Sequence, residues 1–144
     1  MKAFSAIILA FALAAHCDVG MPYKEAAKRN AKDGKPILLE FYAKWCIPCL
    51  EMEKTVFKDV AVQKELRTNF HFVRIDTEKD QGIFCEGQNL KIYDCMTLWE
   101  IDGIPAFAFV NKDGQVLHTT TGDYGTEEFL LLLRAVKADL GKEK

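Results

Sequence analysis

The chain has 144 residues, 49% of them hydrophobic and 28% charged, which suits one domain with a buried core and leaves too little for two. Its 19 lysines and arginines against 21 aspartates and glutamates give a formal net charge of −2, so we expect no nucleic acid as a partner. The 10 phenylalanines, 4 tyrosines and 2 tryptophans argue against disorder over most of the length.

The N-terminal residues are typical of a secretory signal peptide. Lys2 precedes a small and apolar run over residues 3–15, which ends in the Ala-Leu-Ala pattern of a cleavage site. The run is shorter than the roughly 20 apolar residues of a membrane-spanning helix. We therefore predict a signal peptide at residues 1–15, export to the periplasm and a domain over residues 20–144. The alternative is an uncleaved anchor or a buried N-terminal helix.

Cys17 follows this segment and resembles the lipidated cysteine of a bacterial lipoprotein. His16 stands where such signals carry glycine, alanine or serine. A lipid anchor at Cys17 is therefore the minor alternative, and an exposed, reactive thiol is the other.

The sequence after the predicted signal peptide indicates a helix, then a strand, then further helical structure. Residues 23–32 are predicted to be helical, since a proline precedes them and an Asp-Gly pair follows. Residues 37–42 are almost wholly apolar, as in a strand covered on both faces, and Glu40 is the exception. After the next two cysteines we expect helical structure, and then a short helix over residues 60–67 with Asp59 as its N-cap.

The second half predicts three strands and a final helix. The strands occupy residues 70–76, 106–110 and 115–120. The last two flank an Asp-Gly pair, which is a strong hairpin signal. The C-terminal helix has Thr126 as its cap and carries an apolar stripe, whereas residues 77–103 fit no single pattern. This order predicts the α/β class, with a mixed sheet flanked by helices.

Cys46 and Cys49 stand where the buried strand leads into a helix. With two residues between them, their sulfur atoms fall within one turn and can form a disulfide. Cys46 would lie at the helix N-terminus, where free N–H groups and the helix dipole stabilise a thiolate, and Pro48 favours helical geometry in the first turn. Such a pair can be a redox centre, an inert disulfide or half of a zinc site. We favour redox, and expect no metal and no cofactor, because the other cysteines and the histidines form no compact ligand set.

Residues 39–49, Leu-Glu-Phe-Tyr-Ala-Lys-Trp-Cys-Ile-Pro-Cys, resemble the active-site segment of the thioredoxin superfamily. The Glu-Phe-Tyr-Ala stretch is most similar to protein disulfide isomerase domains. The residues after Cys49 resemble exported bacterial thiol:disulfide interchange proteins. Gly103-Ile104-Pro105-Ala106 is similar to the family's cis-proline loop. The resemblance covers roughly residues 22–140 and implies a thioredoxin fold.

The resemblance places Glu40 as a buried acid below Cys49. A carboxylate among Ile37, Leu39 and Phe41 should have a raised pKa, because burial disfavours its charged form. Glu40 could then accept the Cys49 proton near neutral pH.

The resemblance also places Pro105 in cis beside Cys46, preceded by Ile104, where backbone groups would pair with an extended substrate. The expected substrate-binding residues are Trp45, Ile47, Pro48, Ile104 and Pro105.

Between Asp76 and Pro105 the chain is longer than a minimal thioredoxin, so we expect an insertion before the cis-proline loop. This stretch carries Cys85 and Cys95. The favoured interpretation is a structural disulfide that stabilises the insertion in an oxidising compartment. A second redox pair or two free thiols are the alternatives.

These observations predict an exported thiol-disulfide oxidoreductase that reduces protein disulfides: Cys46 attacks, and Cys49 resolves the mixed disulfide. Proline within the Cys-x-x-Cys motif and Ile104 before Pro105 resemble reducing thioredoxins. The alternatives are a disulfide oxidase or isomerase for secreted proteins, and a binding module that keeps the disulfide only for stability. The resemblance suggests a membrane thiol reductase as electron donor, and we expect a monomer.

Overall fold

The computed structural model describes residues 20–79 and 82–142. The predicted signal peptide at residues 1–15 and the predicted lipidation site at Cys17 lie outside the described residues. No helix in the two described ranges is both long and apolar enough to cross a membrane.

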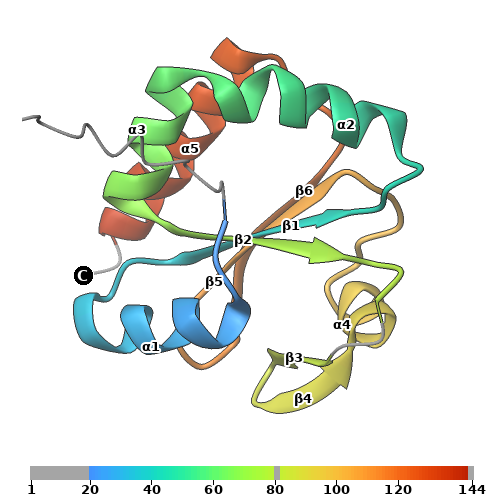
Figure 1. Ribbon diagram of the computed structural model, residues 1–144. Helices are drawn as coiled ribbons and strands as arrows, with labels where there is room; N and C mark the ends of the chain where they lie inside the picture. The colour runs from blue at the N-terminus through green and yellow to red at the C-terminus, as the bar shows by residue number, and fades with distance from the viewer. Residues whose placement is uncertain (1–19, 80–81, 143–144) are drawn as a thin grey trace, which may run out of the picture.

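A four-stranded mixed sheet forms the centre of the molecule (Figure 1). Its strands lie in the order β2 (His71–Asp76), β1 (Ile37–Tyr42), β5 (Ala106–Val110) and β6 (Val116–Thr121). β1 runs parallel to β2 and antiparallel to β5, and β5 runs antiparallel to β6. Because β1 and β5 occupy the middle of the sheet and are covered on both faces, their sequences are almost continuously apolar.

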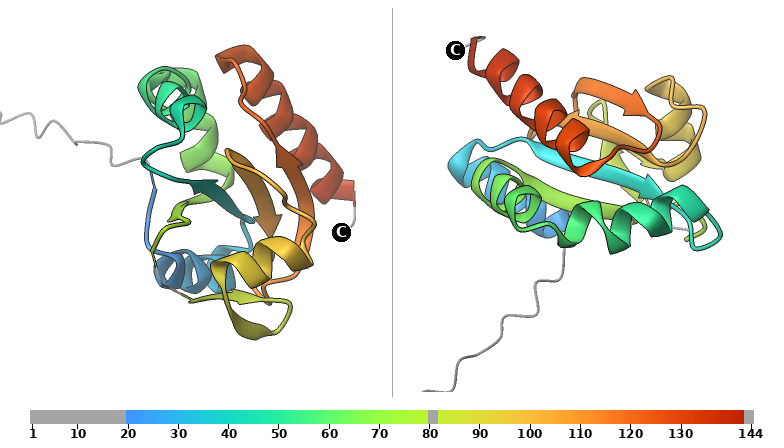
Figure 2. Two further views of the ribbon diagram at one scale, coloured as in Figure 1. Left: turned by 90° about the vertical axis from the view of Figure 1, so that its right-hand side faces the viewer. Right: turned by 90° about the horizontal axis from the view of Figure 1, so that it is seen from above.

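Helices cover both faces of the sheet (Figures 1 and 2). One face carries α2 (Ile47–Lys54), the short 3-10 helix η1 (Val56–Lys58), α3 (Val60–Asn69) and α5 (Thr126–Lys142). The other face carries α1 (Tyr23–Asp33), α4 (Ile92–Leu98) and a small antiparallel hairpin of β3 (Gly82–Cys85) and β4 (Gln88–Lys91).

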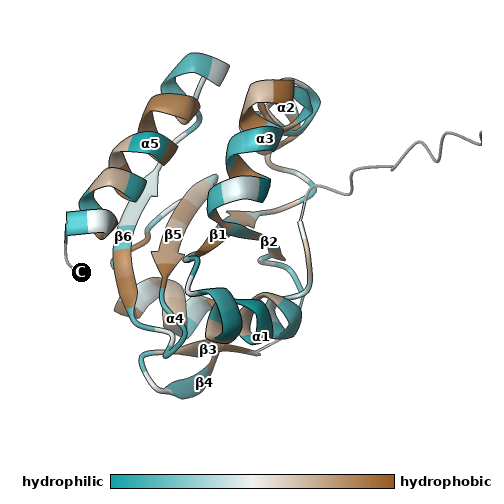
Figure 3. Ribbon diagram, turned by 90° about the vertical axis from the view of Figure 1, so that its left-hand side faces the viewer, coloured by the Kyte–Doolittle hydropathy of each residue, from teal (hydrophilic) through white to brown (hydrophobic). Residues whose placement is uncertain are grey.

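Two apolar cores follow from this layering, one on each side of the sheet. Leu38 of β1 belongs to the core under α3 and α5, whereas Leu39 and Phe41 belong to the core that faces α1 and α4. This division reflects the alternation of side chains along a strand. Figure 3 shows β1 and β5 in hydrophobic colours, while α1 is mainly hydrophilic.

The predicted order of elements, the α/β class and the hairpin that joins β5 to β6 are confirmed. Asp59 caps α3 as predicted, since its carboxylate accepts hydrogen bonds from the N–H groups of the second and third residues of that helix. Thr126 is the first residue of α5 and not its cap, because the N–H of Phe129 already bonds to the carbonyl of Gly125. Residues 77–103, which fitted no single pattern, contain β3, β4 and α4.

Candidate active site

The sheet topology brings the cysteine pair and the loop before β5 together. β1 ends where β5 begins, since these strands are antiparallel and Phe41 is paired with Ala106. The turn that carries Cys46 follows β1, and the loop that contains Ile104 precedes β5. Ile104 therefore packs against the small apolar cluster that includes Cys46 and Cys49.

Cys46 and Cys49 form a disulfide across the first turn of α2, with their Cα atoms 5.3 Å apart. Cys46 is the N-cap of α2, and its Sγ accepts a hydrogen bond from the N–H of Cys49 over 3.3 Å. Pro48 lies in the first turn, where its missing N–H leaves no helical hydrogen bond unmade. In the reduced protein, the same N–H group and the helix dipole can stabilise a thiolate on Cys46. Cys46 exposes 3% of its surface and Cys49 exposes none.

Apolar side chains on both sides of Cys46 face the solvent. Trp45 exposes 65% of its surface and Ile47 exposes 71%. The indole Nε1 of Trp45 donates a hydrogen bond to Oε1 of Glu78 over 3.1 Å, which fixes one edge of the ring. Large apolar side chains with this exposure are available to a docking protein.

The peptide bond between Ile104 and Pro105 is cis, as the resemblance implies. The carbonyl of Pro105 accepts a hydrogen bond from the N–H of Gly122 over 2.9 Å, and proline has no N–H. Within residues 20–79 and 82–142, the backbone of Ile104 forms no hydrogen bond. The backbone N–H and carbonyl of Ile104 can therefore pair with a substrate. Pro105 cannot pair in the same way, because it has no N–H and its carbonyl already accepts a hydrogen bond from Gly122.

Glu40 lies in the middle of β1 with none of its surface exposed. Burial raises the pKa of its carboxyl from 4.5 to about 7, against the opposing effect of the Arg74 guanidinium. The expected neighbours of Glu40 are wrong, because Ile37, Leu39 and Phe41 all lie in the core on the opposite face of the sheet. Glu40 shares its face with Leu38, on the side covered by α2 and α3.

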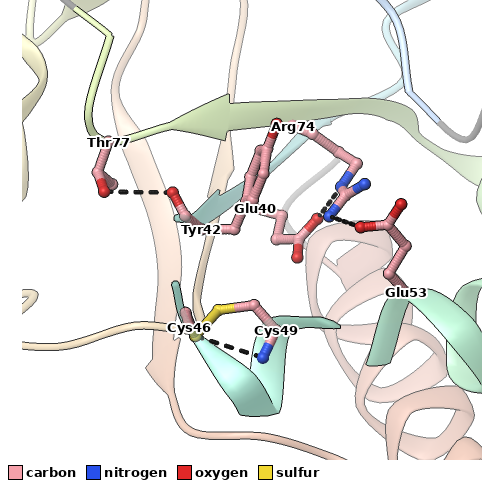
Figure 4. The surroundings of a disulfide bond; sticks show 7 residues. All are labelled: Glu40, Tyr42, Cys46, Cys49, Glu53, Arg74 and Thr77. Atoms are coloured by element: carbon pink, nitrogen blue, oxygen red, sulfur yellow. Dashed lines mark hydrogen bonds and ion pairs between the residues drawn. A yellow bond between two sulfur atoms is a disulfide. The ribbon is translucent and has the colours of Figure 1, made fainter. Parts of the chain in front are cut away.

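Arg74 belongs to this site, although the sequence patterns do not single it out. Its Nε donates to Oε2 of Glu40 over 2.6 Å, and its Nη2 donates to Oε2 of Glu53 over 3.2 Å (Figure 4). Its guanidinium also lies over the ring of Tyr42, 4.3 Å from the ring centroid. Oε1 of Glu40 has no hydrogen-bond partner among the described residues. In the view of Figure 4, the Glu40 carboxyl group lies between Arg74 and the disulfide.

A signal for this ion pair is present in the sequence. Glu40 is the lone charge of the apolar β1, and Arg74 is the only arginine or lysine of β2, which also contains His71 and Asp76. The register of β1 against β2 places Glu40 and Arg74 directly opposite each other. A buried charge needs a partner, so aligning the two predicted strands by these residues would have paired them. Glu53, which α2 brings to the same guanidinium, has no comparable signal because it is an ordinary half-exposed helix residue.

Cys85 and Cys95 form a second disulfide, with Cα atoms 6.1 Å apart, which joins the end of β3 to α4. Both cysteines are fully buried in the core below the sheet, together with Trp99 and Ile101. The two disulfides therefore lie in different surroundings, since the first borders the exposed side chains of Trp45 and Ile47 and the second is enclosed.

The site can carry out thiol-disulfide exchange with its own side chains. It offers a dithiol at a helix N-terminus, a buried carboxyl with a pKa near neutrality, and exposed apolar and backbone groups beside the reacting sulfur. Across residues 20–79 and 82–142, no three histidine, cysteine, aspartate or glutamate side chains come together in an arrangement that could hold a metal ion.

Known proteins are similar to this chain in sequence and in architecture. Residues 23–137 match the family model of the thioredoxin-like domain. The chain is 34% identical over 109 residues to the thioredoxin-like protein HCF164 of Oryza sativa, covering 76% of this chain and 35% of that protein. It is 31% identical over 108 residues to the thiol:disulfide interchange protein DsbD of Haemophilus ducreyi, covering 74% of this chain and 17% of DsbD. The chain thus spans much less than the full length of these relatives.

Solved structures agree with these matches. A thioredoxin from Thermus thermophilus superposes with a TM-score of 0.62 and 25% identity, over 80% of this chain and 83% of that one. The reduced C-terminal domain of Neisseria meningitidis DsbD superposes with a TM-score of 0.57 and 20% identity, over 78% of this chain and 91% of that one. The fold, the Cys46–Cys49 pair and the family match agree: the chain belongs to the thioredoxin-like family of thiol-disulfide oxidoreductases.

Proposed function

We propose that this chain is an exported reductase of protein disulfides that works through the Cys46–Cys49 dithiol. The observation that carries the proposal is the position of Cys46. Its sulfur caps α2 and accepts a hydrogen bond from the Cys49 N–H, between two exposed apolar side chains. It lies beside the backbone of Ile104, which forms no hydrogen bond with any other described residue. The nucleophilic sulfur of Cys46 therefore lies next to a surface that an extended polypeptide could contact.

The first step is the attack of the Cys46 thiolate on one sulfur of the substrate disulfide. A bond forms between Cys46 Sγ and that sulfur, and the other substrate sulfur leaves as a thiolate. The helix N-terminus stabilises the attacking anion. The backbone of Ile104 would hold the substrate segment in an extended conformation, and Trp45, Ile47 and Pro48 would line its path.

The second step is the attack of Cys49 on Cys46 Sγ. The Cys49 thiol must lose its proton, and the carboxylate of Glu40 would accept it. With a pKa of about 7, roughly half of the Glu40 carboxyls are ionised at neutral pH and able to act as base. The step restores the Cys46–Cys49 disulfide and releases the reduced substrate thiol, so an electron pair passes from the dithiol to the substrate.

The proposed direction of electron transfer, from the Cys46–Cys49 dithiol to the substrate, and the proposed cellular compartment rest on separate observations. Proline between the two cysteines and isoleucine before the cis-proline resemble reducing thioredoxins. The leader-like residues 1–15 and the buried Cys85–Cys95 disulfide favour export to an oxidising compartment such as the periplasm. A lipid on Cys17 would anchor the protein to a membrane. A reductase outside the cytoplasm needs an electron donor, and a membrane thiol reductase is the proposed one.

Two measurements test the catalytic proposal. A Cys49→Ser variant should trap substrate proteins as mixed disulfides on Cys46, and a Cys46→Ser variant should trap none. The reduction potential of the pair, measured against glutathione, should lie near or below about −230 mV for a reductant. A value between about −120 and −180 mV would instead identify a disulfide oxidase or isomerase. If neither wild type nor Cys46→Ser reduces a protein disulfide, and the substitution costs only some stability, the chain would be a binding module.

Export is tested independently of catalysis. A fusion of residues 1–20 to a reporter that becomes active only after export should give signal, and the mature protein should lack residues 1–15 by N-terminal sequencing. Retention of the reporter in the cytoplasm would contradict export. Mass analysis of the mature N-terminus decides whether Cys17 carries lipid.

A further inference from the structure

A second groove of the molecule lies between α1 and the β3–β4 hairpin, beside the edge strand β2 (Figure 1). It has a volume of about 690 Å³, and neither cysteine of the redox pair lines it. Its accessible apolar surface comes from Met21, Ala27 and Phe84, which are partly buried, and from the exposed Pro22. The exchange steps proposed above make no use of this groove.

The wall formed by α1 carries two lysines without partners. Lys24 and Lys28 line the groove, and neither forms an ion pair or a side-chain hydrogen bond with another described residue. Glu25, the acidic neighbour of Lys24 in the chain, is bonded to Arg29 over 2.9 Å. None of the lining residues, all of which the structure describes, is an aspartate or a glutamate. This wall therefore favours an anionic ligand.

The other basic residues of the lining already have partners. Arg74 donates hydrogen bonds to Glu40 and Glu53, and Lys112 pairs with Asp113 over 2.8 Å. The positive charge that is open to a ligand is therefore concentrated on α1.

The opposite wall offers the free edge of a β-strand. Within the described part of the chain, β3 pairs with β4 alone. The carbonyl of Phe84 points away from β4, since it accepts a hydrogen bond from the hydroxyl of Tyr23 on α1 over 2.7 Å. The N–H and the carbonyl of a residue in an antiparallel strand point to the same side, so the N–H of Phe84 also points towards α1. Such an edge can bind an extended polypeptide as an additional strand.

The two walls match one pattern of acidic residues. Lys24 and Lys28 lie one helical turn apart on the same side of α1, about 6 Å along its axis. Alternate residues of an extended chain also lie on one side, about 6.7 Å apart. Two carboxylates with one residue between them therefore fit the two lysines. A phosphate or a lipid headgroup would use the lysines and leave the strand edge unused, so the two walls together favour a polypeptide.

We propose that this groove binds an extended acidic segment of a partner protein, which adds as a strand to the free edge of β3. In this arrangement two carboxylates of the segment, with one residue between them, contact Lys24 and Lys28. Tyr23 holds the two walls together through its hydrogen bond to Phe84. The cysteine pair takes no part in this contact, so the proposal goes beyond the function proposed above and does not depend on it.

The test measures the binding of fluorescent peptides to the oxidised full chain by anisotropy at low salt. One peptide has two glutamates separated by a valine, within a segment of threonine and valine. A second peptide has the same composition with adjacent glutamates, whose side chains point to opposite sides of an extended chain. Wild type should bind the first peptide about threefold more tightly than the second. Its affinity for the first peptide should fall as salt is raised.

A Lys24→Ala/Lys28→Ala variant should bind the first peptide about fivefold more weakly than wild type. The matched control is Lys32→Ala/Lys64→Ala, which removes two exposed lysines outside the groove and changes the net charge equally. This control should keep the wild-type affinity. The proposal is overturned if wild type binds both peptides equally or binds neither, or if the two double variants bind the first peptide equally well.

Two methylated forms of the first peptide test strand addition. One form carries N-methyl groups on the glutamates and the other on the valine between them, so each form loses N–H donors on one edge and keeps its charges. The form that is methylated on the edge facing β3 should bind about tenfold more weakly, and the other should bind as the parent does. Equal binding of all three peptides would overturn strand addition.

Two further measurements separate this proposal from its neighbours. Binding of phosphatidylglycerol vesicles that is lost in Lys24→Ala/Lys28→Ala, without binding of either peptide, would identify a lipid surface and overturn the proposal. The same variant should reduce a small synthetic disulfide at the wild-type rate, since the groove excludes Cys46 and Cys49. A failure of peptide binding is therefore distinguishable from a failure of the proposed reductase function.

Discussion

Arg74 donates from Nε to Oε2 of Glu40 over 2.6 Å, and the two residues are register partners on adjacent parallel strands. Burial raises the pKa of the Glu40 carboxyl, whereas the Arg74 guanidinium lowers it by favouring the charged form. The two effects together leave a pKa of about 7. The charge on Arg74 therefore determines whether Glu40 can act as a base for Cys49 at neutral pH.

Replacement of Arg74 by methionine should shift the pH dependence of the exchange reaction. Without the guanidinium, the pKa of Glu40 rises above about 7, so a smaller fraction of the carboxyl is ionised at neutral pH. We expect the attack of Cys49 on a preformed mixed disulfide to slow by about tenfold at neutral pH, and to recover as the pH is raised. Stopped-flow measurement of that step against pH provides the profile.

The control for Arg74→Met is Lys54→Met, which removes an exposed partner of Glu51 on α2. Its pH profile should coincide with that of wild type, because exposed ion pairs contribute little. A profile of Arg74→Met that also coincides with wild type would show that Glu40 is not the proton acceptor.

Glu40 should also make the stability of the protein depend on pH. Its pKa is about 7 in the folded protein against 4.5 for an unperturbed side chain, so the folded state binds this proton more tightly. The stabilisation is fully present below about pH 4.5 and is lost as the pH rises through about 7, with a total of about 3 kcal/mol. Urea unfolding of wild type and Glu40→Gln across this range isolates the contribution.

In Glu40→Gln the side chain cannot titrate, and its amide oxygen can still accept a hydrogen bond from Arg74. The difference in the free energy of unfolding between the two proteins should therefore change by about 3 kcal/mol from pH 4.5 to pH 7, with wild type losing stability relative to the variant. Parallel curves for the two proteins would contradict a raised pKa.

The Cys85–Cys95 disulfide should stabilise the fold independently of redox activity. In the chain-entropy model, closing a loop of this size, with a sequence separation of 10, contributes about 2 to 3 kcal/mol. A Cys85→Ala/Cys95→Ala variant should lose about that amount in urea unfolding. Mild reductant applied to the native protein should open the Cys46–Cys49 bond first, because Cys46 exposes 3% of its surface between two exposed side chains, whereas Cys85 and Cys95 expose none. Mass mapping of alkylated cysteines would reveal the opposite order.

The elements predicted with least ambiguity are those with local signals. The apolar run of β1, the Asp59 cap of α3 and the Asp-Gly hairpin each depend on residues that are neighbours in the chain, and each is confirmed. The position of Cys46 at the start of α2 is local in the same sense, since a strand, a turn and a proline specify it.

The remaining features depend on contacts between distant segments. Arg74 reaches Glu40 across 34 positions of sequence, and only the strand register brings them together. β3 and β4 are short, largely polar at β4, and anchored by the Cys85 disulfide and by Glu86, so no periodicity distinguishes them from a loop. The occupied carbonyl of Pro105 is likewise invisible in the sequence, because its partner Gly122 follows two strands later.

Gly114 links the β5–β6 hairpin to β3 through a close approach of two backbones. It has a φ of 71°, and a Cβ at this position would lie 2.7 Å from the carbonyl oxygen of Phe84. Its own carbonyl accepts a hydrogen bond from the N–H of Glu86 over 2.9 Å. A side chain here would therefore both strain the backbone and force β3 away from the hairpin.

Gly34 is the matched reference for this position, because its φ is 70° and a Cβ there would meet nothing within 4 Å. Gly34→Ala should cost about 1 kcal/mol of unfolding free energy through backbone strain alone. Gly114→Ala should cost an additional 1 to 3 kcal/mol, roughly, because backbone atoms of Phe84 must move. Urea unfolding of the two variants measures both losses, and equal losses of stability would mean that β3 moves away from Gly114 at no cost in free energy.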